Sequence, residues 1–358
     1  MRFAGRSYVR PIEVAIPFVL VVLALIGGAL SAPHFLSGNH LSSMGQTAGY
    51  VGIIAIGETI VLLLGGIDLS VPYTLNLAAI LLAGFQYDGK STSAGILLVL
   101  LVGLGVGLAN GIGVAVLDIS PLVMTLGMNS ILQGIALLYS HGSPVGGAPT
   151  IVTTVSTGWW HQIPYVDLMW LVLTVAITLM LVFTTFGRSL YAIGSNRRAS
   201  ELSGMSVRRS IVAGYALSAL AATVGGILLV GYSGQAYLGM GDDYLLPAIA
   251  VVVIGGTSIF GGRGSYLQTV AGALLITVLE STLVTANVSQ SGQDILYGGI
   301  ILAMAYVNQV AIAGGATRLR TLGARVGPFR GWLEPVGTRP EHAMGTSSKS
   351  RQEGATDE

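Results

Sequence analysis

Residues 167–209 read DLMWLVLTVAITLMLVFTTF followed by GRSLYAIGSNRRASELSGMSVRR. The first half, 167–186, is an apolar run long enough to cross a bilayer as a helix, since a span needs roughly 20 such residues. The second half, 187–209, is polar. Its arginines are Arg188, Arg197, Arg198, Arg208 and Arg209. Cytoplasmic loops of membrane proteins concentrate Lys and Arg, so the sequence predicts that 187–209 lies on the cytoplasmic side.

The remaining cations follow the same alternation of apolar runs and polar breaks. Of the 17 Lys and Arg residues, only Lys90 falls in a break on the opposite side. Besides the five arginines of 187–209, the other cations precede the first run, lie in a second inner break or follow the last run. They are Arg2, Arg6, Arg10, Arg263, Arg318, Arg320, Arg325, Arg330, Arg339, Lys349 and Arg351. Both termini are therefore expected in the cytoplasm.

The composition indicates a membrane protein. The chain has 358 residues, of which 52% are apolar and 9% charged, whereas about 25% of a soluble domain is charged. There is no cysteine, which excludes disulfides, thiolate metal sites and thiol catalysis. The first apolar run is too long for the h-region of a signal peptide and is interpreted as a retained span.

Ten apolar runs predict an all-α integral membrane protein with about ten transmembrane helices. They are 12–32, 44–64, 71–87, 94–117, 121–139, 167–186, 210–231, 244–261, 266–286 and 293–313. Glycine and proline interrupt several runs, so some spans are expected to be broken or re-entrant. Residues 1–11 are then a cytoplasmic N-terminus, 12–313 the transmembrane domain and 314–358 a polar cytoplasmic tail that we expect to be disordered.

Five polar residues inside the apolar runs are candidates for a translocation pathway: Glu58, Asn76, Asn110, Asn129 and Glu280. A charge at the centre of a bilayer costs about 2.5–3.5 kcal/mol on insertion scales, so both glutamates must face protein or a cavity. They either form structural hydrogen bonds to neighbouring helices or line a polar route. A proton relay would need a chain of such groups, which two isolated glutamates do not provide.

Small residues recur at every fourth position of the run 94–117. Gly103, Gly107, Gly111 and Ala115 would form one ridge on a helix. Such a ridge lets another helix approach closely. Asn110 lies beside it and could either join the two helices by a hydrogen bond or contact the pathway.

Residues 84–91 match the phosphate-loop pattern G-x-x-x-x-G-K-S in full. That loop binds phosphate only between a strand and a helix of a soluble sheet. Here the match lies between two membrane runs, so we interpret it as a coincidence. The five histidines show no ligand spacing, no Ser/His/Asp set occurs, and the cations follow membrane topology, which excludes a nucleic-acid partner.

The inner break 187–209 has room for one short helix. Asn196 is a favourable N-cap and Gly204 a favourable residue just beyond the C-terminus. Arg197 and Arg198 would lie at the positive end of the helix dipole and Glu201 near its negative end, which is unfavourable. A helix this short needs a packing partner. The alternative is a plain interfacial loop.

Four stretches in order resemble the permease subunits of bacterial ABC importers for sugars, the ribose-type family, which is related to branched-chain amino acid permeases. They are GGIDLSV at 65–71, NG at 110–111 with ISPLVMTLG at 119–127, FGR, YAIG and ELSG between 186 and 204, and IGGTS with GGRG between 254 and 264. Together with their spacing they cover residues 12 to about 313.

The resemblance implies a ten-helix subunit that pairs with a second copy, or a similar chain, around one pathway. A separate ATPase dimer, which holds ATP and magnesium, binds inside, and a sugar-binding protein docks outside. This chain is then neither an enzyme nor a cofactor protein. The implied contact with the ATPase is a coupling helix whose residues are Asn196, Arg197, Arg198, Ala199, Glu201, Leu202 and Gly204. The implied structural turns contain Gly65, Gly66, Asp68, Ser70, Gly255, Gly256, Gly262 and Gly264.

The predicted function is transport of a ribose-like sugar across the cytoplasmic membrane by alternating access. Three alternative functions remain open from the sequence: a branched-chain amino acid permease, an ion-coupled secondary transporter, and a membrane enzyme or passive channel. An ion-coupled transporter needs ion ligands near the middle of the membrane, and only Glu58 and Glu280 are available.

Overall fold

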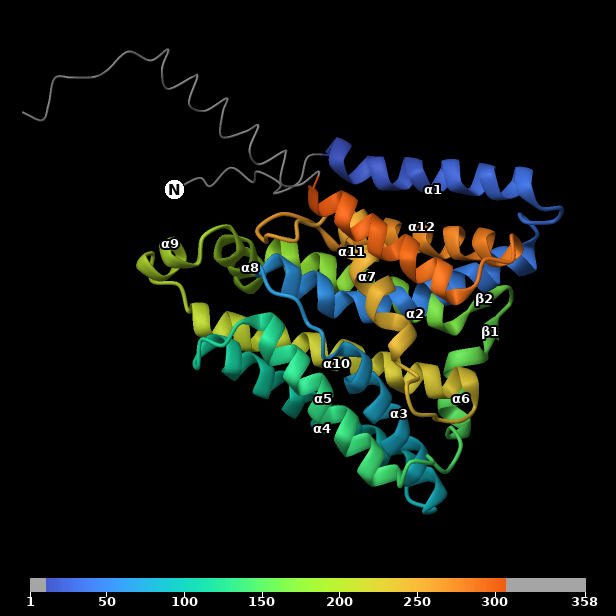
Figure 1. The fold of residues 1–358 in the computed structure, drawn as a ribbon, viewed down its shortest axis with the longest axis horizontal. Helices are drawn as coiled ribbons and strands as arrows, with labels where there is room; N and C mark the ends of the chain where they lie inside the picture. The colour runs from blue at the N-terminus through green and yellow to red at the C-terminus, as the bar shows by residue number, and fades with distance from the viewer. Residues whose placement is uncertain (1–10, 307–358) are drawn as a thin grey trace, which may run out of the picture. The chain divides into compact units, whose positions relative to one another are not determined.

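The structure is a computed structural model that describes residues 11–306. The N-terminal residues 1–10, the end of the predicted span 293–313 and the predicted tail 314–358 lie outside the described residues. All of the described residues belong to one compact unit (Figure 1).

The described chain is built almost entirely of helices, as the apolar runs predict. Its helices are α1 (Pro11–Ser31), α2 (Gly38–Leu63), α3 (Val71–Tyr87), α4 (Thr92–Ala115), α5 (Pro121–Ser140), α6 (Thr150–Thr157), α7 (Tyr165–Phe183), α8 (Thr185–Ser195), α9 (Arg197–Leu202), α10 (Val207–Ser233), the 3-10 turn η1 (Asp242–Tyr244), α11 (Leu245–Ile254) and α12 (Tyr266–Thr285). A further helix runs over residues 290–306. The strands β1 (Trp159–Trp160) and β2 (Ile163–Pro164) form a small antiparallel hairpin.

Seven of these helices are long and apolar enough to cross a membrane. They are α1, α2, α4, α5, α7, α10 and α12. The predicted span 244–261 is not one continuous helix, because α11 has 10 residues. At 1.5 Å per residue α11 is about 15 Å long, half of the hydrocarbon thickness. This short helix fits the expectation that some spans are broken.

The core is organised around α2 and α10. The most apolar stretch of α2 is 94% buried and that of α10 is 67% buried, against 17% for α1 and for α5. Helix α10 packs against α2, α3, α4 and α6, whereas α1 lies along α12 at the edge of the bundle (Figure 1). The outer helices keep their leucines, isoleucines and valines exposed, which in a bilayer places these side chains against lipid.

The small-residue ridge on α4 is the contact surface for α10. A Cβ added to Gly107 would lie 2.6 Å from Ala216 Cα, and one added to Gly111 would lie 2.6 Å from Val212 Cα. Only glycine permits this approach of the two backbones. The prediction of close helix packing at the ridge is confirmed, and it makes α4 and α10 antiparallel neighbours.

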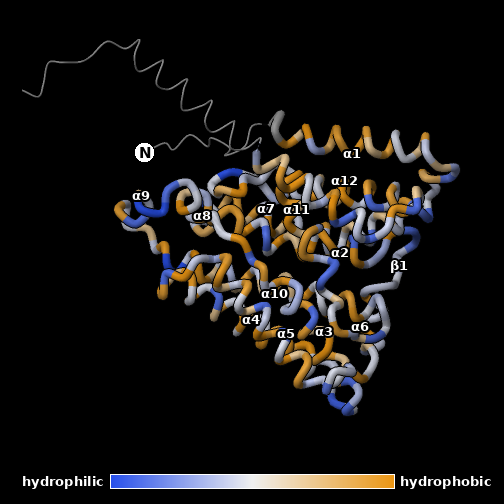
Figure 2. The backbone as a smooth tube through the Cα atoms, in the orientation of Figure 1, coloured by the Kyte–Doolittle hydropathy of each residue, from blue (hydrophilic) through white to orange (hydrophobic). Residues whose placement is uncertain are grey.

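The two ends of the bundle differ in charge. Every arginine among residues 11–306 belongs to the end that carries α8 and α9, here called the α9 end. Lys90 follows α3 at the opposite end, which also carries β1 and β2 and is here called the hairpin end. Figure 2 shows hydrophilic residues at α9 and at β1, with mostly hydrophobic helices between them.

Helix α3 begins inside the bundle. The segment 64–70 turns back after α2, so that the backbone N–H of Asp68 donates to Glu58 Oε1 at 3.4 Å. Glu58 lies five residues before the end of α2, about 8 Å from that end. Asp68 therefore lies deeper than the end of α2, because the Gly65 turn, with φ of +81°, reverses the chain. The predicted span 71–87 therefore starts in the interior of the helix bundle and not at its α9 end.

Candidate functional site

The turn between α2 and α3 is organised by the Asp68 carboxylate. Asp68 Oδ1 accepts hydrogen bonds from Ser70 N at 3.0 Å and from Ser70 Oγ at 2.6 Å. Asp68 Oδ2 accepts one from Ser218 Oγ of α10 at 2.7 Å. The carboxylate is 1% exposed. This arrangement holds the turn to its own backbone and to the central helix.

Side chains from α4 and α5 complete this polar group. Asn110 Nδ2 donates to Ser70 Oγ at 2.9 Å. Leu69 N donates to Thr125 Oγ1 at 3.0 Å. We call Glu58, Asp68, Ser70, Asn110, Thr125 and Ser218 the Asp68 cluster. It joins α2, the 64–70 turn, α4, α5 and α10 at one buried point.

The five pathway candidates differ in their burial and in their hydrogen-bond partners. Glu58 and Asn110 belong to the Asp68 cluster, where both are buried. On α3, the buried Asn76 donates to Tyr237 O at 2.7 Å, and Tyr73 N donates to Asn129 Oδ1 of α5 at 3.3 Å. Glu280 is half-buried on α12, toward the hairpin end. Four of the five residues therefore lie on or against the 64–70 turn and the first two turns of α3, and Glu280 lies on α12.

The glycine-containing turns meet at the α9 end. Gly262 N donates to Leu63 O at 3.0 Å, which joins the segment after α11 to the end of α2. A Cβ added to Gly261 would lie 2.8 Å from Gly65 N and 3.0 Å from Gly194 Cα of α8. Among the other predicted turn glycines, Gly256, Gly262 and Gly264 also have positive φ, whereas Gly66 and Gly255 do not. Three backbone segments thus touch where α8 leads into α9.

Helix α9 ends as the sequence predicts. Asn196 Oδ1 accepts from Ala199 N at 2.9 Å, which is the predicted N-cap. At the other end Gly204 N donates to Glu201 O at 3.0 Å and Met205 N to Ser200 O at 3.1 Å. These two bonds, with φ of +78° at Gly204, form a Schellman motif. The alternative of a plain loop is excluded for residues 197–202.

The charges of α9 are compensated by their neighbours. Glu201 lies 3.5 Å from Arg197 and 3.4 Å from Arg198, and Arg197 also lies 3.3 Å from Asp118 in the α4–α5 loop. These pairs offset the unfavourable order of charges along the helix dipole. Each is solvent-exposed and stabilises the helix by about 0.2–1 kcal/mol. The Arg197–Asp118 pair connects α9 to the start of α5.

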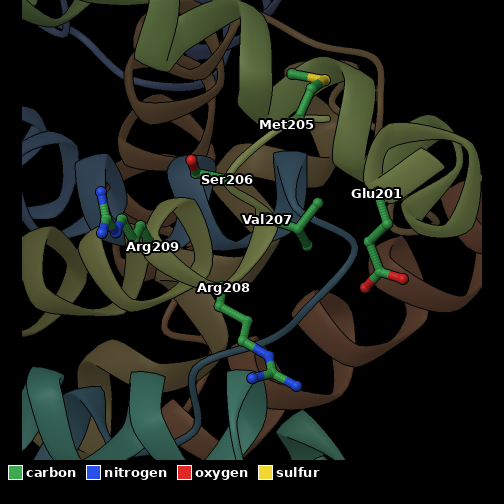
Figure 3. A pocket seen from close by; sticks show the side chains of 6 residues that line it. All are labelled: Glu201, Met205, Ser206, Val207, Arg208 and Arg209. Carbon is green, nitrogen blue, oxygen red and sulfur yellow. The ribbon is translucent and has the colours of Figure 1, made fainter. Parts of the chain in front are cut away.

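The free face of α9 carries an exposed leucine. Leu202 is 77% exposed, and Ala199 beside it is also exposed. Next to α9 lies an open surface pocket of about 480 Å³. It is lined by Glu201, Met205, Ser206, Val207, Arg208 and Arg209, which Figure 3 shows around one opening. The free face of α9 thus combines one exposed apolar side chain with charged neighbours.

The phosphate-loop match has the wrong local structure for phosphate. Residues Gly84 to Tyr87 are the last turn of α3, and no strand precedes them. The Lys90 amine bonds to Asp88 Oδ2 at 2.8 Å, and this bond and the charge of Asp88 raise the pKa of Lys90. The interpretation as a chance match agrees with this geometry.

The sequence did not single out Ser218 and Thr125 of the Asp68 cluster, or Tyr215, whose hydroxyl lies beside Gly66 of the turn. They lie in the apolar helices α10 and α5, where serine, threonine and tyrosine are common and carry no spacing signal. The Tyr215 hydroxyl is buried without a hydrogen-bond partner among the described residues. Only the packing of α10 and α5 against the 64–70 turn identifies these residues.

The fold and the site define a polytopic helical membrane protein whose polar elements include one buried cluster and one exposed helix at a charged end. Residues 41–305 match the family described as "Branched-chain amino acid transport system / permease component". The chain belongs to this permease family. The family and the seven candidate spans make it a multi-pass protein of the cytoplasmic membrane.

Curated relatives cover most of the chain. The autoinducer 2 import system permease protein LsrD of Escherichia coli (strain SMS-3-5 / SECEC) is 32% identical over 306 residues, which are 84% of this chain and 92% of the relative. The ribose import permease protein RbsC of Bacillus subtilis (strain 168) is 33% identical over 288 residues, which are 80% of this chain and 89% of the relative. No solved structure matches the chain.

Proposed function

We propose that this chain is the membrane-spanning subunit of an ATP-driven importer for a ribose-like monosaccharide. The observation that carries the proposal is the 33% identity to a ribose import permease over 89% of that protein's length. The proposed topology has ten spans with both termini in the cytoplasm, and the α9 end is the cytoplasmic end. The confinement of the described arginines to that end supports this orientation.

The partners follow from this role. An ATPase dimer that holds ATP and magnesium binds at the α9 end, and a sugar-binding protein docks at the hairpin end. A second permease chain, identical or similar, completes the pathway. The chain itself is not an enzyme and holds no cofactor. Exposed Leu202 and the capped, charge-compensated α9 support its role as the helix that contacts the ATPase.

Two contacts connect α9 to the Asp68 cluster in this mechanism. One runs through α8, where Gly194 packs against Leu63 and Gly262. The other runs through the Arg197–Asp118 pair to α5, where Thr125 accepts from Leu69 N. Both end at the 64–70 turn, from which α3 starts. Movement of α9 on ATP binding would therefore shift α3 and alternate the access of the pathway.

The partly exposed polar residues are better pathway candidates than the buried ones. Glu58, Asn76 and Asn110 are closed off from solvent, whereas Asn129 and Glu280 are only partly buried. Sugar hydroxyls need accessible amide and carboxyl groups. We therefore assign Asn129 and Glu280 to the pathway, and Glu58 and Asn110 to its mechanical support.

The deciding experiment is ATP hydrolysis by the reconstituted complex of this chain, its ATPase and its binding protein. Ribose should stimulate hydrolysis and its own uptake, and Glu201→Arg should reduce co-purification of the ATPase while the permease still inserts. Asp88→Asn, a change at the opposite end, is the matched control. Undiminished co-purification of Glu201→Arg contradicts the coupling role of α9.

The orientation has a direct test because the chain contains no cysteine. Leu202→Cys should react with a membrane-impermeant thiol reagent only from the cytoplasmic side, and Lys90→Cys only from the other side. Labelling of Leu202→Cys from outside intact cells would reverse the proposed topology.

The family description favours one second candidate, a branched-chain amino acid permease. The same reconstituted assay separates the two, since leucine, isoleucine or valine would then replace ribose as the stimulating substrate. Uptake without any ATPase would instead indicate an ion-coupled transporter.

A further inference from the structure

Two acidic side chains meet inside the bundle. Glu58 on α2 and Asp68 in the 64–70 turn are each 1% exposed. They are neighbours, because Glu58 Oε1 accepts from the backbone N–H of Asp68 at 3.4 Å. Two ionised carboxylates at such a site would repel each other strongly in a medium of low dielectric constant.

No positive charge balances the pair within residues 11–306. The ion pairs of the described chain join only Lys90, Arg197 and Arg198 to exposed acids. The polar groups around the pair are uncharged. Ser70 and Ser218 bond to Asp68, Asn110 bonds to Ser70, and Thr125 bonds to Leu69 N. The Tyr215 hydroxyl lies beside Gly66, and Thr59, the residue after Glu58, bonds to Thr269 of α12. Helix α11 contributes only apolar side chains. A buried carboxyl that has neither a counter-ion nor several hydrogen-bond donors is neutralised by binding a proton.

The hydrogen bonds indicate which of the two carboxyls holds that proton. Asp68 accepts three hydrogen bonds, from Ser70 Oγ at 2.6 Å, Ser218 Oγ at 2.7 Å and Ser70 N at 3.0 Å. Donors that point at a carboxyl favour its ionised form. Glu58 accepts a single long contact, at 3.4 Å. The ionised group is therefore Asp68.

The cluster also offers acceptors for an acidic O–H. Asn110 Oδ1 and the Tyr215 hydroxyl are both buried and have no hydrogen-bond partner within residues 11–306. The Asn110 amide belongs to the cluster through its bond to Ser70 Oγ, and the Tyr215 hydroxyl lies against the 64–70 turn, 2.5 Å from the position of a Cβ added to Gly66. A neutral carboxylic acid needs an acceptor for its proton, which a carboxylate does not.

We propose that Glu58 is a proton-binding site: its side chain is a neutral carboxylic acid beside an ionised Asp68. Because Glu58 is protonated, the buried cluster carries one negative charge instead of two. It thereby keeps the 64–70 turn folded against α2, at the point where the contacts from α8 and α5 converge. This inference depends on burial and hydrogen bonding, and not on which substrate the protein carries.

Infrared spectroscopy of the full-length chain in lipid nanodiscs at neutral pH detects the protonated group directly. Wild-type protein should show the C=O stretch of a protonated carboxyl, shifted in D₂O, and Glu58→Gln should remove it. Glu201→Gln is the matched control, since Glu201 is exposed and paired with arginines, and its band pattern should equal that of wild type. A spectrum of Glu58→Gln that retains the whole band, or loss of the band in Asp68→Asn alone, overturns the assignment.

Folded yield gives a second readout. Glutamine is a close neutral mimic of protonated glutamate, so Glu58→Gln should keep the yield of monodisperse protein within about twofold. Asp68→Asn removes the negative charge of a carboxylate that accepts three hydrogen bonds, and it should lower that yield by roughly tenfold or more. Equal losses in the two variants would mean that Glu58 is ionised and would contradict the proposal.

Discussion

The Asp68 cluster and helix α9 both use carboxylates to hold a short backbone segment, but they do so under opposite conditions. Asp68 is buried and accepts from three donors, with no cation beside it among the described residues. Glu201 is exposed and paired with two arginines. In water such ion pairs stabilise little, whereas a buried donor that loses its acceptor costs its full desolvation energy. Polar substitutions should therefore lower the free energy of unfolding far more in the Asp68 cluster than on α9.

The largest effect is expected for Asp68→Ala. It leaves Ser70 N, Ser70 Oγ and Ser218 Oγ buried without their acceptor, which should lower the free energy of unfolding by about 3 kcal/mol or more. Thermal unfolding of the purified chain in detergent measures the loss. Asp88→Ala, which breaks only the exposed pair with Lys90, is the control and should change stability by about 0–1 kcal/mol. A similar loss in both variants would remove the contrast between buried and exposed carboxylates.

A second, smaller effect tests whether the interior is limited by packing. Gly107→Ala places a methyl group against the Ala216 backbone, so it should cost about 1–3 kcal/mol by overpacking. Gly105→Ala, on the same helix, meets no atom within 4 Å, and alanine favours a helix over glycine by about 1 kcal/mol. Unfolding temperatures of the two variants should thus move in opposite directions. A stabilised Gly107→Ala would show that α4 and α10 do not pack as described.

The N-cap of α9 is expected to have a local effect. Asn196→Ala removes the acceptor for Ala199 N and should destabilise α9 by about 1 kcal/mol. Since α9 is short and exposed, global unfolding should hardly change, while co-purification with the ATPase should fall. Asn196→Ser preserves a capping oxygen and should restore binding. Equal binding by the alanine and serine variants would argue that the cap is not needed.

The smallest effect is expected at the exposed ion pair between α9 and the α4–α5 loop. A double-mutant cycle with Arg197→Ala and Asp118→Ala should give a coupling energy of about 0.2–1 kcal/mol. That coupling should weaken as salt is added, because exposed charges are screened. A coupling energy that does not fall at high salt would mean that a partner buries the pair. The carboxylates of the α9 end would then be shielded from solvent, as Asp68 is in the cluster.

Local features of the chain could be predicted well. The capping of α9 by Asn196 and its termination at Gly204 depend only on neighbouring residues and follow from their identity. The glycine ridge on α4 predicted a close helix contact, though not that α10 is its partner. Glu58 and Asn110 were noticed because polar groups inside apolar runs need an explanation, but their alternatives could not be separated from spacing alone.

The sequence by itself determined that the chain is an α-helical membrane protein with its arginines at one end. Hydropathy and charge act residue by residue through transfer between water and lipid, so they can be read without a fold. Only the tertiary structure decided that α3 starts inside the bundle, that α11 is half a span, and that Ser218, Asn110 and Thr125 close around the 64–70 turn. These facts depend on contacts between residues up to 150 positions apart, which no local pattern encodes.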